Sequence, residues 1–171
     1  IDLFIETAHR VLNEKPELNL SFQIYGDGPL LDTLTSLSNE LGIDNKVYFE
    51  GHKDNLVQEL SDIDMLLMTS DHEGLPMIML EAMALKIPVI AHAVGGIPVL
   101  LDHGNCGLLV TNQSDTGYAA AIATLIESPD LKARITEKAY RRVIDRYSAE
   151  NNAAQYESVY RTIAINQGVN P

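Results

Sequence analysis

Two glutamates eight positions apart form the most suggestive chemical pattern in this sequence. Glu73 lies in a loop expected to follow a buried strand at 64–68, and Glu81 is the single charged residue of an apolar helix expected at 77–85. A carboxylate buried in such a helix is costly unless hydrogen bonds are donated to it. The two vicinal hydroxyl groups of a ribose or another sugar would satisfy both of its oxygens. Alternatively, Glu81 pairs with an internal Lys or Arg and Glu73 is solvated.

The residues between the two glutamates prepare the start of the same helix. Gly74 allows a ligand to approach the backbone closely, Leu75 follows it, and Pro76 suits the first turn of a helix. The free N–H groups and the positive end of the helix dipole at this point favour an anion. A phosphate at the helix start, with Glu73 and Glu81 on either side, would describe a pocket for a nucleotide sugar.

Two glycine-containing loops add to this pattern. The segment YGDGP at 25–29 contains Gly26 and Gly28, whose amides could face a phosphate or a base. It departs from the G-x-G-x-x-G pattern because Leu31 occupies the third glycine position, so an ordinary β-turn is the competing interpretation. The segment AVGGIP at 93–98 is another glycine loop between an expected strand and an expected helix.

Hydrophobic patterning predicts strands that alternate with helices. The expected strands lie at 18–26, 46–50, 64–68, 87–91 and 107–110. The expected helices lie at 2–14, 29–41, 54–61, 77–85, 114–127, 131–146 and 149–165, with a short one within 95–102. This alternation predicts an α/β fold: a Rossmann-like, doubly wound parallel sheet with helices on both faces and further helices at the C-terminal end. Such sheets bind ligands beyond the carboxyl ends of their strands, here the loops at 25–29, 50–54, 69–76, 91–96 and 110–114.

Composition limits the class of protein. A chain of 171 residues with 46% hydrophobic residues is sufficient for one domain with a sizeable core. The formal charge of −12 argues against broad nucleic-acid binding, which needs a basic surface, but it permits a small anion held by backbone amides. The single cysteine, Cys106, forms no internal disulfide and is expected to pack in the core.

Three other groups of polar residues are weaker candidates. Asp62 and Asp64 imitate an Asp-x-Asp metal motif, but they should lie at the amino end of a strand, so we expect no metal site. His52 lies in a carboxyl-end loop and could contact a base. Half of the basic residues fall around the helix expected at 131–146, which indicates a solvated helix face, with contact to an anionic membrane as the alternative.

At Glu73 and Glu81 the sequence resembles the group 1 glycosyltransferases (family 4, GT-B fold), and specifically their C-terminal, donor-binding domain. The resemblance extends through nearly the whole chain. It is carried by YGDGP at 25–29, VYFEGH at 47–52, DIDMLLMTSDHEGLPMIMLEAMA at 62–84, PVIAHAVGGIPVLLDHGNCGLLV at 88–110 and YSAENNAAQYESVYR at 147–161.

The resemblance implies a retaining enzyme that moves a hexosyl group from a nucleotide diphosphate sugar to a glycan or glycolipid acceptor, as in polysaccharide biosynthesis. It implies that Glu81 holds the ribose hydroxyls, that Glu73 contacts the sugar, and that nearby amides face sugar and phosphate. Positioned donors and a helix dipole would stabilise the departing diphosphate, so no metal and no cofactor besides the donor substrate are expected. No catalytic residue is assigned. The residues implied in donor binding are Glu73, Gly74, Leu75, Pro76, Glu81, Gly26, Gly28 and Pro29.

The resemblance also implies parts outside residues 1–171. The sequence opens on an expected helix, whereas the first strand of a doubly wound sheet is usually central, so we expect the donor-binding half of a longer protein. The family's first strand, with its diphosphate-binding Arg and Lys, and an N-terminal acceptor domain would precede it. The half alone is expected to be inactive. A cytoplasmic location, with peripheral contact at the inner membrane face, is a further expectation.

Two alternative functions are compatible with these residues. A nucleotide-sugar epimerase has a donor half built alike, although Glu73 and Glu81 together with YGDGP favour transfer. A non-catalytic nucleotide-binding or partner-binding module could keep the same fold, because fold does not determine function. The base, the sugar, the acceptor and the oligomeric state do not follow from the sequence.

Overall fold

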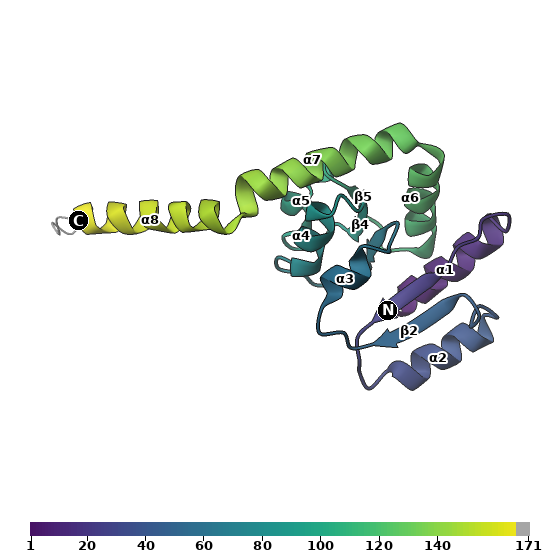
Figure 1. Ribbon diagram of the computed structural model, residues 1–171. Helices are drawn as coiled ribbons and strands as arrows, with labels where there is room; N and C mark the ends of the chain where they lie inside the picture. The colour runs from purple at the N-terminus through teal and green to yellow at the C-terminus, as the bar shows by residue number, and fades with distance from the viewer. Residues whose placement is uncertain (167–171) are drawn as a thin grey trace.

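The computed structural model describes residues 1–166, and Figure 1 shows a body of strands and helices from which the last helix projects. The strands are β1 (Phe22–Tyr25), β2 (Val47–Gly51), β3 (Leu66–Met68), β4 (Val89–His92) and β5 (Leu108–Val110). The helices are α1 (Asp2–Glu14), α2 (Leu31–Glu40), α3 (Leu56–Leu60), α4 (Met77–Ala84), α5 (Ile97–Leu100), α6 (Asp115–Glu127), α7 (Pro129–Tyr147) and α8 (Ala149–Asn166), with the 3-10 turn η1 (Asp102–Gly104) after α5. Every strand and helix expected from the sequence is present, so the α/β class is confirmed.

The strand pairings are parallel, as the alternation of strands and helices predicts, but the strands form two separate sheets. β1 pairs with β2, and β4 lies between β3 and β5. β4 is buried along its whole length, because it has a strand on each side and helices on both faces. Within the described residues, β1 and β3 each pair along one edge only.

The strand expected at 18–26 is shorter than predicted because its first residues form local turns. The amide of Leu18 donates to the carbonyl of Lys15 at 3.1 Å, and the amide of Leu20 donates to the carbonyl of Leu18 at 3.1 Å. These donors are used within the turns instead of a sheet ladder. β1 therefore begins at Phe22.

A shared core joins the two sheets through α1 and α6, which pack against each other. Burial of one large aliphatic side chain contributes roughly 1.5–3 kcal/mol to the stability of the fold. Because α1 and α6 bury several side chains against residues of both sheets, this helix pair is a principal link between the sheets. Its buried residues belong to one cluster with residues of β1, β2, β4 and β5: Ile5, Ala8, Val11, Phe22, Ile24, Val47, Ile90, Val110, Tyr118, Ala119, Ile122 and Leu125. A second cluster packs α4 and α5 against α7, with Met79, Met83, Ile97, Leu100, Ala139 and Val143 among its members.

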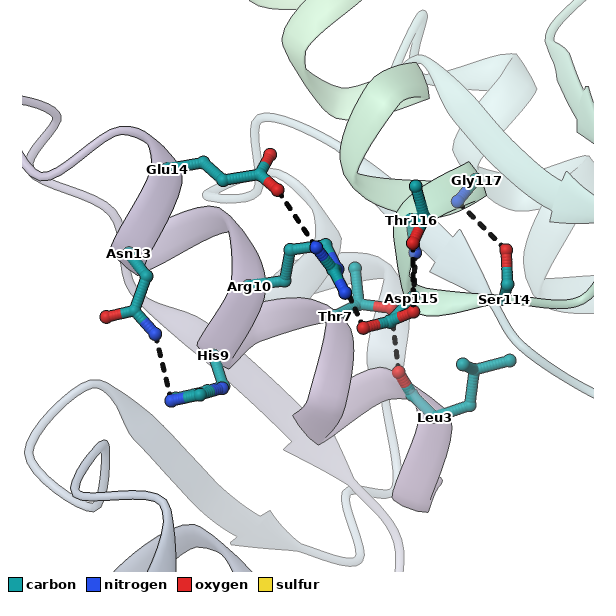
Figure 2. Close-up of polar contacts among 10 residues, drawn as sticks. All are labelled: Leu3, Thr7, His9, Arg10, Asn13, Glu14, Ser114, Asp115, Thr116 and Gly117. Carbon is teal, nitrogen blue, oxygen red and sulfur yellow. Dashed lines mark hydrogen bonds and ion pairs between the residues drawn. The ribbon is translucent and has the colours of Figure 1, made fainter.

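Polar contacts reinforce the packing of α1 on α6 at its edge (Figure 2). Arg10 Nε donates to Asp115 Oδ2 at 2.7 Å, and Arg10 Nη1 donates to Glu14 Oε1 at 3.1 Å. Ser114 Oγ accepts a hydrogen bond from the Gly117 amide at 3.1 Å and so caps α6. The hydrogen bond from Arg10 holds the pKa of Asp115 below its ordinary value. The pair of Arg10 and Asp115 therefore contributes fully to stability at pH values above the ordinary pKa of an aspartate. This contribution is lost as the pH falls through the lowered pKa of Asp115.

α7 and α8 are separated by a short break in the helix. Ser148, between them, is extended, with a ψ of 153°. The side-chain amide of Asn151 donates to the carbonyls of Ile144 and Asp145, at 3.0 Å each, and so caps the end of α7. α8 then projects away from the body (Figure 1). In the described part of the chain, no helix combines the length and the apolar character needed to cross a membrane.

The substitution Tyr118→Phe tests how far the core depends on one buried hydroxyl. Tyr118 is fully buried, and its hydroxyl donates to the Met68 carbonyl at 2.7 Å, which ties α6 to the end of β3. We expect the substitution to lower the free energy of unfolding by about 1 kcal/mol, because the carbonyl loses its donor. Urea denaturation measures the difference. Tyr156→Phe, on the exposed surface of α8, is the control and should leave the midpoint unchanged; equal midpoints for the two variants would contradict the assignment.

Candidate functional site

The carboxyl ends of β3, β4 and β5 bring three loops together, as parallel strands require. The amide of Gly96, after β4, donates to the carbonyl of Glu73, after β3, at 3.4 Å. The side chain of Gln113, after β5, donates to Asp71 Oδ1. The loops expected to share one edge of the sheet are therefore in direct contact.

Gly95 and Gly96 are required by the closeness of this contact. A Cβ atom on Gly95 would overlap the Glu73 carbonyl oxygen, and one on Gly96 would overlap the Gly74 carbonyl oxygen. Gly95 also has a φ of 53°, a left-handed conformation that other residues adopt only at a cost. The glycine loop after β4 therefore supports the backbone that carries Glu73.

The start of α4 presents backbone donors without acceptors. Pro76 is extended, with φ −71° and ψ 117°, and α4 begins at Met77, the first residue of the helix expected at 77–85, so Pro76 immediately precedes the helix. The Pro76 carbonyl accepts the first helical bond, from the Met79 amide at 3.1 Å. No side chain caps α4, and the amides of Met77 and Ile78 have no backbone acceptor within residues 1–166. Such amides attract a negative charge.

Glu81 lies one helical turn after Met77 and so shares its face of α4. Its side chain is half-buried, as is that of Glu73. In the described part of the chain neither glutamate takes part in an ion pair. The internal Lys or Arg partner considered as an alternative from the sequence is therefore not seen there, and both carboxylates have acceptor capacity to spare.

The residues between Glu73 and α4 differ in exposure. Gly74 is exposed and Pro76 is buried. Leu75 is 48% exposed and Met77 is 63% exposed, which is unusual for large apolar side chains. The start of α4 thus offers apolar side chains, free amides and two carboxylates within a few residues.

The loop after β1 forms a second group of candidate residues at the carboxyl end of the other sheet. Gly26 has a φ of 128°, and its amide donates to the Gly51 carbonyl at 2.8 Å. Gly28 has open space around its Cα, and Gly28 and Pro29 are both exposed. The structure thus joins this loop to the loop after β2. No hydrogen bond among residues 1–166 links it to the loop of Glu73.

The weaker candidates from the sequence have ordinary positions. Asp62 and Asp64 lie between α3 and β3, at the amino end of β3 as expected, and the Asp62 amide closes a turn onto Glu59. His52 is 70% exposed, 3.6 Å from Asp54. Cys106 is buried, as expected, and burial raises the pKa of its thiol. Among the described residues, no group of three or more His, Cys, Asp or Glu side chains is arranged to hold a metal ion.

Two supporting residues were not identified from the sequence. His92, at the end of β4, is buried, and its Nδ1 lies 3.3 Å from the Ser70 carbonyl oxygen at the base of the Glu73 loop. The hydroxyl of Tyr118 donates a hydrogen bond to the carbonyl of Met68, at the end of β3. A histidine that ends an otherwise apolar strand, in VIAH, was the available signal for the first of them. Tyr118 resembles any other core aromatic in the sequence.

The fold and the site together define an α/β ligand-binding domain whose loops meet at the carboxyl edge of a parallel sheet. The family model for glycosyl transferases group 1 matches residues 1–142. The chain belongs to the group 1 glycosyltransferases.

Several characterised proteins are similar to this chain. The N-acetyl-alpha-D-glucosaminyl L-malate synthase of Bacillus anthracis is 33% identical over 144 residues, which are 84% of this chain and 38% of that protein. The crystal structure of TarM matches with a TM-score of 0.81 and 27% identity, over 94% of this chain and 32% of that one. The structure of Anabaena HepE in complex with UDP-glucose matches with a TM-score of 0.82 and 25% identity, over 93% of this chain and 44% of that one. The chain thus spans less than half the length of each of these relatives.

Gly95→Ala tests whether the loop after β4 supports the loop of Glu73. We expect a loss of about 2 kcal/mol in the free energy of unfolding, because the new Cβ meets the Glu73 carbonyl and the backbone is left-handed. Urea denaturation measures the loss, and amide NMR should show the largest shifts at residues 73–76. Gly28→Ala is the control, since it has open space and no left-handed φ. If both variants unfolded at the same urea concentration, the supporting contact would be disproved.

Proposed function

We propose that this chain binds a nucleoside diphosphate sugar and is the donor-binding half of a retaining glycosyltransferase that transfers a hexosyl group to a glycan or glycolipid acceptor. The observation that carries the proposal is Glu81, a half-buried carboxylate without an ionic partner in the described residues, placed one turn beyond the uncapped start of α4. The chain's relatives support it, because one of them, Anabaena HepE, is described in complex with UDP-glucose.

Glu81 is suited to hold the ribose of the nucleotide. Two carboxylate oxygens match the two vicinal hydroxyls, and hydrogen bonds to an ionised group are stronger than those between neutral groups. Glu73 lies in the loop before α4, where its carboxylate would contact the sugar. The two carboxylates bind neutral hydroxyl groups in this arrangement, so they do not meet the phosphates.

The start of α4 is suited to the diphosphate. The chain carries a formal charge of −12, so a diphosphate is repelled by the molecule as a whole. Binding therefore requires local donors, and the amides of Met77 and Ile78 with the positive end of the helix dipole provide them. The same donors would stabilise the charge that develops on the departing diphosphate. In this proposal the donor substrate needs no additional cofactor.

The loop of Gly26, Gly28 and Pro29 would form the nucleotide side of the site. Its glycines leave the backbone accessible, and its contact with Gly51 fixes the loop at the end of its own sheet. The acceptor would be bound by another domain of a longer protein, and we propose that this protein acts in the cytoplasm, in peripheral contact with the inner membrane face. No catalytic residue is assigned within the present chain.

Titration with UDP, GDP and ADP, followed by amide NMR, tests the donor site. We expect one nucleotide to shift the amides of Gly26, Gly28, Glu73 and Gly74. Glu81→Ala should weaken that nucleotide's binding about tenfold or more, because hydrogen bonds to a charged group are lost.

Glu40→Ala is the matched control for this titration. It removes the same charge from an exposed position on α2, and it should leave the affinity unchanged. Weak and equal binding of all three nucleotides, indifferent to Glu81→Ala, would reject the donor site and favour a non-catalytic module of the same fold.

We also propose that a further parallel strand of the longer protein lies between β1 and β3. Each of these strands pairs along one edge only among the described residues, yet Phe22 and Ile24 of β1 share a core with Leu67 of β3. A doubly wound sheet has its first strand at this central position.

Amide hydrogen exchange in the longer protein tests the additional strand. Exchange in β1 and β3 should be slower than in residues 1–171, because the strand would supply hydrogen-bond partners. β4 pairs on both sides already and is the internal control. Unchanged exchange in β1 and β3 would eliminate the additional strand.

A further inference from the structure

A cavity lined by charged residues lies at the amino-end side of the three-stranded sheet, away from the candidate donor site at the carboxyl ends of the strands. It has a volume of about 350 Å³ and lies between α7 and the segment that leads into the amino end of β5. We call it the basic groove. The groove is lined by Asp102, Asn105, Cys106, Lys138, Arg141, Arg142, Asp145 and Arg146.

Three cations of the basic groove follow one ridge of α7. Lys138, Arg142 and Arg146 are spaced four residues apart, so they lie above one another on the same face of the helix. Like charges at this spacing destabilise a helix. Their gathering is notable in a chain with 12 basic and 24 acidic residues. A row of cations that lines a cavity is a candidate binding surface for an anion.

Arg142, the middle cation of the ridge, already has hydrogen-bond and ion-pair partners within the fold. Arg142 Nε donates to the Leu100 carbonyl at 2.8 Å, and Nη2 donates to the Val99 carbonyl at 2.7 Å. Its Nη1 lies 3.3 Å from Asp102 Oδ1, and its side chain is only 12% exposed. Arg142 therefore closes the end of α5, and its charge is balanced by Asp102.

Lys138 and Arg146 have no comparable partners among the described residues. Neither forms an ion pair within residues 1–166, whereas the adjacent Arg141 is paired with Glu137 at 2.9 Å. Of the acidic residues in the groove, Asp102 is used by Arg142, which leaves Asp145. The lining holds four cations and two carboxylates, and the pairing of Arg141 with Glu137 from outside the lining still leaves the groove with more positive than negative charge.

The wall opposite α7 is formed by a left-handed turn. Asp102, His103 and Gly104 have successive φ values of 49°, 52° and 98°, a region in which Asp, His and Gly are among the residues found most often. Cys106, beside them, is buried with its thiol pKa raised by burial, so the thiol adds no negative charge. The groove thus has the left-handed turn and Cys106 on one side and the basic residues of α7 on the other.

We propose that the basic groove binds a phosphate group, carried either by a soluble phosphate ester or by a phospholipid headgroup. Lys138 and Arg146 are two turns, or about 12 Å along the helix axis, apart. Their long side chains can converge on one phosphate group placed between them, and a divalent anion would balance both of their charges. Nucleic acid is disfavoured as a ligand because the rest of the chain is strongly acidic. The groove is separate from the donor site, since the two lie at opposite ends of β5.

Titration with inorganic phosphate at constant ionic strength, with chloride as reference, tests the groove. We expect saturable shifts of the Asn105 and Cys106 amides with phosphate. The double variant Lys138→Gln/Arg146→Gln should weaken this binding about tenfold or more. Lys132→Gln/Arg134→Gln removes the same charge from the same helix outside the groove and should bind as the unmodified chain does.

Vesicles distinguish the two sources of the phosphate. Sedimentation with phosphatidylcholine vesicles that contain phosphatidylglycerol, but not with pure phosphatidylcholine, would identify a lipid headgroup as the source. Phosphate binding without sedimentation would identify a soluble ester.

Two outcomes would overturn the groove as a phosphate site: equal, unsaturable shifts with phosphate and chloride, or an equal loss in both double variants. A nucleotide titration of the same variants separates this proposal from the donor site, because Lys138→Gln/Arg146→Gln should leave nucleotide affinity unchanged.

Discussion

The packing of α1 on α6 is the constraint on which the rest of this structure depends. The two sheets share no strand pairing among the described residues, so side-chain packing must hold them in one body. The buried residues of α1 contact the buried face of α6, and the ion pair between Arg10 and Asp115 closes the edge of this contact. α6 also reaches the end of β3 through Tyr118, so the helix pair positions the loop edge of the larger sheet.

Alternation in the sequence was sufficient to predict the fold class and the order of its elements, because strand and helix periodicity are local properties. Which strands pair with one another was not predictable, since strand order depends on contacts between distant residues. The shortened β1 also escaped prediction. Leu18 and Leu20 have the alternating pattern of a strand, but their amides are used in turns next to the end of α1.

The candidate site shows the same division between local and distant information. Glu81 could be singled out because a charge in an apolar helix is recognisable in the sequence, and Glu73 because it follows a buried strand. The close contact of Gly95 with Glu73 could not be found, because it joins loops after different strands. The start of α4 at Met77 was predictable, because Pro76 favours a helix start in its own sequence neighbourhood. The role of the basic residues on α7 likewise depends on which of them the fold already uses.

The projection of α8 divides the chain into two parts with different folding cooperativity. The body is held by cores that connect elements distant in sequence, so its parts unfold together. Much of α8 is stabilised by neighbours along its own length, such as Glu157 with Arg161 and the stacked rings of Tyr156 and Tyr160. A helix stabilised in this way follows a gradual helix–coil equilibrium that depends on length and temperature. Its helical content is therefore expected to vary with conditions that leave the body fully folded.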